Sequence, residues 1–197
     1  AARRISVSRD RLMDGNFEMN GLRPMLRLEN STICFVGFGN IARNLYRKMR
    51  AFFGHVVAVD PYITDRSMYP DVEFLELHEA LSRADVVTMH LQLTPATRGI
   101  IGEQEFQSMK PGVIFVNTAR GGLVDEAALM RALDSGRISY CALDVLGTEN
   151  FSESPLLHRE NVILTPHISW CSEAALAELQ KKTAQNVVET FLHGEPI

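Results

Sequence analysis

The sequence predicts an α/β fold in which helices cover both faces of a parallel sheet. Short, wholly apolar runs such as 33–36 and 113–116 recur along the 197 residues, and segments with helical spacing separate them. Strands that are apolar at every position are typical of sheets buried on both faces, which are parallel sheets. The repeated strand–helix order indicates a doubly wound sheet, whose ligands bind beyond the carboxyl ends of the strands.

Six strands and four main helices are expected along the chain. The strands occupy residues 33–36, 56–59, 86–89, 113–116, 140–143 and 162–164. Helical spacing predicts helices over about 41–52, 77–82, 125–133 and 172–192. Asp125 is the expected N-cap of the third of these helices and Gly136 its stop. The last helix is expected to carry on one face Leu176, Leu179, Thr183, Val187 and Phe191.

Length and composition limit the classes of protein that fit. A chain of 197 residues suits one large domain, or one domain with part of another, and 46% apolar residues suffice for a core. The net charge of -4 argues against nucleic acid and anionic membranes as partners, and no apolar run is long enough to span a bilayer. The N-terminal residues lack the apolar stretch of a signal peptide.

The three cysteines, Cys34, Cys141 and Cys171, are odd in number, and two of them sit in apolar runs. We interpret them as reduced thiols of a cytosolic protein. No metal-ligand spacing occurs among Cys and His, so no metal is expected. The first residue is Ala rather than Met, and we expect the chain to be truncated or proteolysed.

A glycine motif follows the first expected strand. Gly37-Phe-Gly39-Asn40-Ile41-Ala42 has the pattern G-x-G-x-x-A, and it opens the first buried helix. In this context Gly37 allows a tight turn, Gly39 lets the backbone approach a pyrophosphate, and the helix N-terminus offers free N–H groups. The motif therefore predicts a dinucleotide site, although a glycine turn that binds nothing is the alternative.

Asp60 ends the second expected strand, 18 residues after Ala42. A carboxylate at this point can accept hydrogen bonds from the ribose hydroxyls of NAD and repels the 2′-phosphate of NADP. The nearest Arg is Arg66, which reaches the same place only if the loop folds back. NAD is therefore the expected cofactor. The alternative is that Asp60 merely starts an Asp-Pro turn.

Polar residues with complementary chemistry follow the last three expected strands. Arg120, flanked by Gly121 after the fourth strand, is placed to grip a carboxylate with paired N–H groups. Asp144 ends the fifth strand, Glu149 follows five residues later, and His167 follows the sixth strand. A His beside a carboxylate makes a general acid/base whose pKa the carboxylate raises. Each residue taken alone is also explained as a surface charge, a cap or a structural side chain. Their placement after successive strands favours one common site.

Several stretches resemble the D-isomer-specific 2-hydroxyacid dehydrogenases. The resemblance rests on residues 89–97, 109–112, 116–125, 142–145 and 165–167, and its most specific part is the run Asn-Thr-Ala-Arg-Gly-Gly-Leu-Val-Asp at 117–125. It covers nearly all of residues 30–197 and implies an NAD-dependent oxidoreductase that transfers a hydride between NAD(H) and C2 of a 2-hydroxy or 2-keto acid.

The resemblance also implies roles for individual residues. Arg120 would bind the substrate's carboxylate and C2 oxygen, His167 would exchange the proton, and Glu149 would pair with His167. The expected cofactor contacts are Gly37, Gly39, Asn40, Ile41, Asp60, Leu91, Gln92, Thr97, Thr118, Ala119, Arg120, Asp144 and His167, with Asp144 holding the nicotinamide carboxamide.

Some positions depart from the family pattern. Ala42 stands where many members have Gly, and Gln92 stands where Pro is usual. Asn150 follows Glu149 where the family often has Pro, which loosens the loop that carries Glu149. Trp170 is reminiscent of members that act on glycerate or hydroxypyruvate.

The resemblance suggests how the chain is organised. Residues 1–20 are expected to be an interdomain helix, 21–171 the NAD-binding Rossmann domain, and 172–197 a helix that returns to the substrate domain. The N-terminal substrate domain, roughly 100 residues, is expected to be missing. A cytoplasmic homodimer is expected.

Three alternatives remain at this point. An NAD-sensing regulatory protein, similar to corepressors of this fold, is the main one. A formate-type dehydrogenase would favour Gln at position 149, and S-adenosylhomocysteine hydrolase lacks the Arg-Glu-His pattern.

Overall fold

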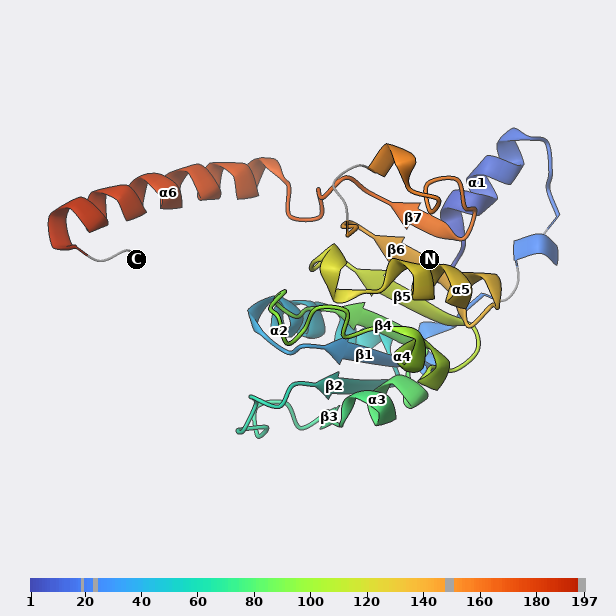
Figure 1. Cartoon of the computed structure of the whole chain (residues 1–197), viewed down its shortest axis with the longest axis horizontal. Helices are drawn as coiled ribbons and strands as arrows, with labels where there is room; N and C mark the ends of the chain where they lie inside the picture. Colours follow the sequence, from blue (N-terminus) through green and yellow to red (C-terminus); the bar gives the residue numbers. More distant parts are fainter. Residues whose placement is uncertain (19, 23–24, 148–150, 195–197) are drawn as a thin grey trace. The chain divides into compact units, whose positions relative to one another are not determined.

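A seven-stranded parallel sheet forms the centre of the fold (Figure 1). The structure is a computed structural model, and it describes residues 1–18, 20–22, 25–147 and 151–194. The chain divides into a first unit, Ala1–Pro166, and a second unit, His167–Ile197. The sheet lies entirely in the first unit.

The strand order is β3-β2-β1-β4-β5-β6-β7. The strands are β1 (Thr32–Val36), β2 (His55–Val59), β3 (Val72–Phe74), β4 (Val86–Met89), β5 (Val113–Asn117), β6 (Ile138–Leu143) and β7 (Val162–Leu164). The order reverses between β1 and β4, so the crevice for a ligand is expected beyond the carboxyl ends of these two strands. The doubly wound parallel sheet is thus confirmed.

Helices cover both faces of the sheet (Figure 1). On one face lie α3 (Leu77–Arg83), α4 (Glu103–Ser108) and α5 (Glu126–Asp134), and on the other lie α1 (Ile5–Met13) and α2 (Asn40–Met49). Alternate residues of β1 point to opposite faces: Cys34 and Val36 join the first core, whereas Ile33 and Phe35 join the second. Two separate cores therefore hold the helices to the sheet.

The structure corrects the expected list of elements in two places. A seventh strand, β3, pairs with β2 at the sheet edge, and α4 precedes β5. β3 has only three residues, with Glu73 exposed in the middle, and α4 buries only Phe106. Neither segment carries enough apolar residues to show a period. The expected N-cap is confirmed, because the Asp125 carboxylate accepts the N–H of Ala128 at 3.0 Å.

The second unit consists mainly of α6 (Glu173–His193). Ser172 caps its N-terminus by accepting the N–H of Ala175, and Gly194 ends it in the left-handed conformation. Leu179, Val187 and Phe191, three residues of the expected apolar face, are exposed. Such a helix face is typically covered by another part of a protein.

Two further observations concern the part of the chain that the structure describes. Cys34 and Cys141 are buried free thiols whose pKa burial raises to about 12, and Cys171 is a free exposed thiol. None of the described helices has both the length and the apolar character that a membrane crossing requires.

Candidate cofactor and catalytic site

The glycine turn after β1 has the geometry of a phosphate-binding turn. Gly37 has a φ of +91°, and a Cβ at this position would lie 2.9 Å from the carbonyl of His90. Only glycine fits such a conformation and such a close approach of two backbones. Ala42, by contrast, is completely buried against the sheet, which confirms the packing role of the third small residue.

The start of α2 is open to a ligand. Gly39 is its N-cap, no side chain caps the helix, and a Cβ at Gly39 would meet nothing within 4 Å. Asn40 and Ile41 are exposed in the first turn. The unsatisfied N–H groups and the partial positive charge of the helix end therefore face open space, as a pyrophosphate requires.

Asp60 ties the end of β2 to this turn. Its Oδ2 accepts the N–H of Phe38 at 2.8 Å, and its Oδ1 accepts the N–H of Tyr62 at 3.0 Å. The Asp-Pro turn considered from the sequence is thus present, but the same carboxylate also holds the glycine turn. Carboxylate oxygens accept more than one hydrogen bond each, so the tether leaves acceptor sites for ribose hydroxyls.

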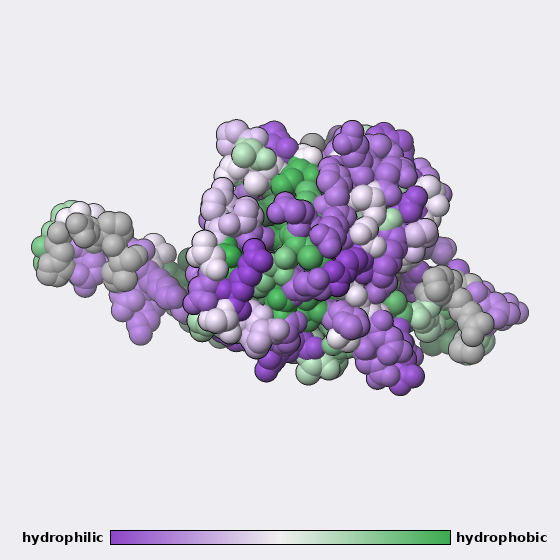
Figure 2. All heavy atoms as spheres, turned by 90° about the horizontal axis from the view of Figure 1, so that it is seen from below, coloured by the Kyte–Doolittle hydropathy of each residue, from purple (hydrophilic) through white to green (hydrophobic). Residues whose placement is uncertain are grey.

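A cavity of about 480 Å³ adjoins Asp60. Its walls are mostly apolar, and such walls suit a flat aromatic ring of a ligand. They include Val36, Val59, Asp60, Tyr62, Arg66, Phe74, Leu75, Leu77, Leu91, Thr97 and Ile100. Figure 2 views the molecule from the β3 edge of the sheet and shows an apolar stripe between hydrophilic flanks.

Arg66 shares this cavity with Asp60. The loop between β2 and β3 does fold back, because the Arg66 guanidinium lies 4.9 Å from the centre of the Phe74 ring. The condition that the sequence left open for Arg66 is therefore met, and an acidic and a basic side chain both border the place expected for the ribose.

A second cavity, of about 600 Å³, brings together Thr118 and Ala119, two residues expected at the nicotinamide half, whereas Thr97, expected beside them, lines the cavity next to Asp60. The second cavity is lined by Ile41, His90, Leu91, Gln92, Leu93, Thr118, Ala119 and Arg120. Leu91 borders both cavities, so they adjoin at the crevice between β1 and β4. Thr97 stabilises the loop on this side by donating its hydroxyl to the Gln92 carbonyl at 2.6 Å.

Arg120 is positioned by Asn117, the last residue of β5. Asn117 is 1% exposed, and its side chain accepts the N–H of Ala119 at 3.0 Å and donates to the Arg120 carbonyl at 2.9 Å. The N–H of Asp144 donates to the Asn117 carbonyl at 2.9 Å. The ends of β5 and β6 are therefore joined directly beneath the Arg120 loop.

Gly121 and Glu126 bring the loops after β5 and β6 together. A Cβ at Gly121 would overlap the carbonyl of Leu146, and the Glu126 carboxylate accepts the N–H of Gly147. Sequence reasoning assigned no role to Asn117 or Glu126. Asn117 acts on residues two and three positions along the chain, whereas Glu126 reaches Gly147, 21 residues away. The paired glycines after Arg120 were the only signal of this close approach.

His90 is a wall residue that the sequence analysis did not select. Its ring stacks on Phe35 at 5.7 Å, and its Nε2 lies 3.0 Å from the Thr88 hydroxyl. Burial lowers the pKa of His90 to about 4, so the ring is neutral at physiological pH. The cavity wall beside Gln92 is therefore uncharged.

The remaining expected catalytic residues are placed differently. Asp144 is 2% exposed, and its carboxylate accepts the Thr165 hydroxyl at 2.5 Å, so its role toward the nicotinamide stays a prediction. Glu149 lies outside the described residues. His167 belongs to the second unit, where it has a φ of +54° and its carbonyl accepts the indole N–H of Trp170 at 2.8 Å.

Comparisons with known proteins agree with this geometry. The family model of the NAD-binding domain of D-isomer-specific 2-hydroxyacid dehydrogenases matches residues 1–169. A D-3-phosphoglycerate dehydrogenase of Mycobacterium bovis is 41% identical over 160 residues, covering 81% of this chain and 30% of that protein. A glycerate dehydrogenase of Methylorubrum extorquens is 35% identical over 176 residues, covering 88% and 54%.

A solved structure agrees as well. The D-lactate dehydrogenase of Aquifex aeolicus, complexed with NAD and lactic acid, has a TM-score of 0.87 and 29% identity, over 98% of this chain and 62% of that one. The chain spans less than two thirds of the length of each of these relatives. With the glycine turn, the two adjoining cavities and the family match in agreement, the chain belongs to the D-isomer-specific 2-hydroxyacid dehydrogenase family and is its NAD-binding domain.

Proposed function

We propose that the protein containing this chain transfers a hydride between NAD(H) and C2 of a D-2-hydroxy acid or its 2-keto acid. The observation that carries this proposal is Arg120 on the wall of the cavity next to the glycine turn. A guanidinium at that point can bind a substrate carboxylate beside the expected nicotinamide. The named relatives are enzymes, which does not favour the NAD-sensing regulatory alternative.

The residues of the first unit fit the cofactor along its whole length. The cavity beside Asp60 and Tyr62 suits the adenosine, the open start of α2 suits the pyrophosphate, and the cavity beside Thr118 and Ala119 suits the nicotinamide. When bound, NADH supplies the hydride, and the protein orients the reacting groups and supplies the electrostatic field around them. We retain Asp144 as the residue that orients the carboxamide.

The chemical roles of the chain's own residues follow from their types. Arg120 neutralises the substrate carboxylate and polarises the C2 carbonyl. His167 donates a proton to the C2 oxygen in reduction and removes it in oxidation. Glu149 pairs with His167, as the family resemblance implies. Residues 21–171 act as the cofactor domain, while residues 1–20 and 172–197 join it to a substrate domain.

The substrate is a small acid. The relatives are named for phosphoglycerate and glycerate, and Trp170 is the residue reminiscent of glycerate-type members. We also propose that the protein is a cytoplasmic homodimer, as the family resemblance implies.

The test of this function is an assay of the whole protein with NADH and a panel of 2-keto acids. Arg120→Ala is expected to lower kcat/KM by about 100-fold or more, because charge-assisted hydrogen bonds contribute about 1.5–3 kcal/mol each. Its Kd for NADH should rise far less than kcat/KM falls, because Arg120 is only one of the expected cofactor contacts. Arg47→Ala, an exposed residue of α2, is the matched control. Normal turnover in Arg120→Ala would remove this residue from the mechanism.

A further inference from the structure

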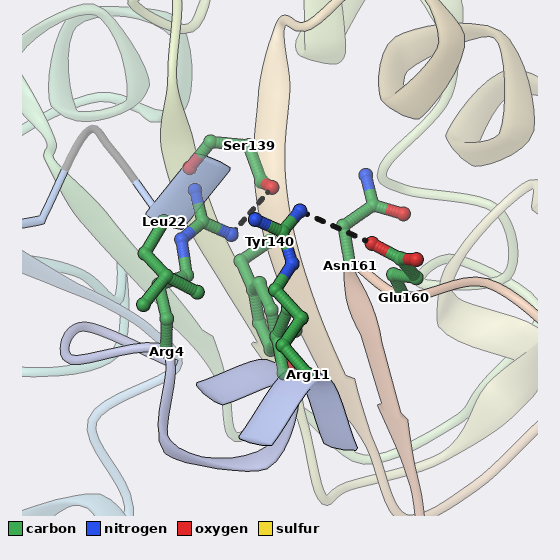
Figure 3. A pocket seen from close by; sticks show the side chains of 8 residues that line it. Arg4, Arg11, Leu22, Ser139, Tyr140, Glu160 and Asn161 are labelled. Carbon is green, nitrogen blue, oxygen red and sulfur yellow. Dashed lines mark hydrogen bonds and ion pairs between the residues drawn. The ribbon is translucent and has the colours of Figure 1, made fainter. Parts of the chain in front are cut away.

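A smaller pocket lies between α1 and the strands β6 and β7 (Figure 3). Its volume is about 190 Å³, and it is lined by Arg4, Val7, Arg11, Leu22, Ser139, Tyr140, Glu160 and Asn161. Ser139 and Tyr140 lie at the start of β6, and Asn161 directly precedes β7. The pocket therefore borders the amino ends of these strands, and no residue of the proposed mechanism lines it.

Arg4 enters the pocket as a partly buried cation. Its Nη1 donates to the Ser139 carbonyl at 3.0 Å, and its guanidinium lies 4.7 Å from the centre of the Tyr140 ring. Among the described residues, no carboxylate is within ion-pair distance of Arg4. Burial lowers the pKa of Arg4, which reflects the cost of holding this cation away from water. A guanidinium has five N–H groups, and one carbonyl uses only one of them.

The local backbone holds Arg4 in this position. Arg4 has a φ of +53°, an uncommon value for a residue with a side chain, and it precedes the first turn of α1. Val7 of α1 is buried in the second core, and the hydroxyls of Ser6 and Tyr140 lie 2.5 Å apart. These contacts fix α1, and with it the guanidinium, against β6.

Arg11 brings a second cation to the same space. Figure 3 shows the guanidinium groups of Arg4 and Arg11 directed into one pocket, each with a single dashed contact. The contact of Arg11 is an ion pair of 3.6 Å with Glu160, which is longer than a hydrogen bond. The Glu160 side chain is 77% exposed, so it can turn toward water at little cost. The lining groups together carry a net charge of +1.

We propose that this pocket binds a phosphate group, either as inorganic phosphate or as the phosphate of a small metabolite. Two guanidiniums that converge from different directions match a tetrahedral dianion, because each can donate paired N–H groups to its oxygens. The Asn161 side-chain amide, on the opposite wall in Figure 3, offers a further donor. The pocket is a site distinct from the cofactor cavities and independent of the proposed function.

The test is a calorimetric titration of the chain with phosphate and with glycerol 3-phosphate, at constant ionic strength and with saturating NAD⁺. The NAD⁺ keeps phosphate away from the start of α2. Arg4→Gln and Arg11→Gln are expected to weaken phosphate binding by about tenfold or more each. Arg3→Gln and Arg9→Gln, neighbouring exposed arginines, are the matched controls and should change it by less than about twofold.

A variant that binds phosphate more tightly cannot be explained by a failure to fold, so one such variant completes the test. Glu160→Gln removes the competing carboxylate and should tighten phosphate binding severalfold. Tighter binding of glycerol 3-phosphate than of phosphate would identify a metabolite as the ligand, and the reverse order would identify the free ion. Equal weakening in all four arginine variants, unchanged affinity in Glu160→Gln, or no saturable binding below about 10 mM would each overturn the proposal.

Discussion

The adenosine end and the catalytic end of this domain are built in different ways. At the adenosine end, Asp60 accepts two backbone N–H groups and Gly37 packs directly on the His90 carbonyl, so the backbone of three adjacent strands fixes the site. At the catalytic end, Arg120 lies in the first unit, His167 in the second, and Glu149 outside the described residues. The proposed contacts of the adenosine half thus belong to one sheet, whereas the proposed catalytic residues lie in loops that are far apart in the sequence.

The largest effect is expected from Gly37 and Gly39, the two glycines of the turn after β1. Gly37→Ala forces a Cβ to 2.9 Å from the His90 carbonyl at a φ of +91°, and should lower the free energy of unfolding by about 2 kcal/mol or more and abolish NADH binding. Gly39→Ala meets no protein atom, so it should keep its stability but bind NADH about tenfold or more weakly.

Thermal melts and NADH titrations of the two variants check this contrast. Wild-type NADH affinity in Gly39→Ala would show that the pyrophosphate does not approach the open space at the start of α2. Wild-type stability in Gly37→Ala would show that the turn after β1 is less constrained than its geometry implies.

A smaller effect is expected from His90, on the wall of the catalytic-end cavity. In the unfolded chain its pKa is near 6.5, and in the folded chain burial lowers it to about 4. The stability supplied by the neutral ring is therefore complete above pH 6.5 and is lost as the pH falls toward 4. His90→Gln should reduce the loss of unfolding free energy between pH 7 and 4.5 by about 1–2 kcal/mol.

Chemical denaturation at a series of pH values measures this effect. His158→Gln, at an exposed position, is the matched control for the loss of an imidazole. Identical pH profiles for wild type and His90→Gln would mean that folding does not lower the pKa of His90.

The sequence was most informative where structure depends on local pattern. The buried strands, the capped helix α5 and the glycine turn follow from runs of a few residues, and all three are confirmed. Six of the expected cofactor contacts line one cavity, and their contact with the cofactor stays a prediction; they are Ile41, Leu91, Gln92, Thr118, Ala119 and Arg120.

Features that depend on distant contacts were not predictable in the same way. Strand β3 is defined by its pairing with β2 rather than by its own three residues. The tether from Asp60 to Phe38 and the return of Arg66 to the cavity depend on how a 12-residue loop folds. By contrast, the side chain of Asn117 organises the Arg120 loop through contacts two and three residues along the chain, and its residue type alone did not reveal this role.

The most direct test of this contrast is a fluorescence titration of the 197-residue chain with NADH and with NADPH. If the adenosine end is complete within residues 1–166, NADH should bind saturably and clearly tighter than NADPH, because Asp60 borders the ribose position. Tighter binding of NADPH would contradict the role of Asp60 and assign the selectivity to Arg66. Absence of binding for both would contradict the claim that this sheet alone holds the cofactor.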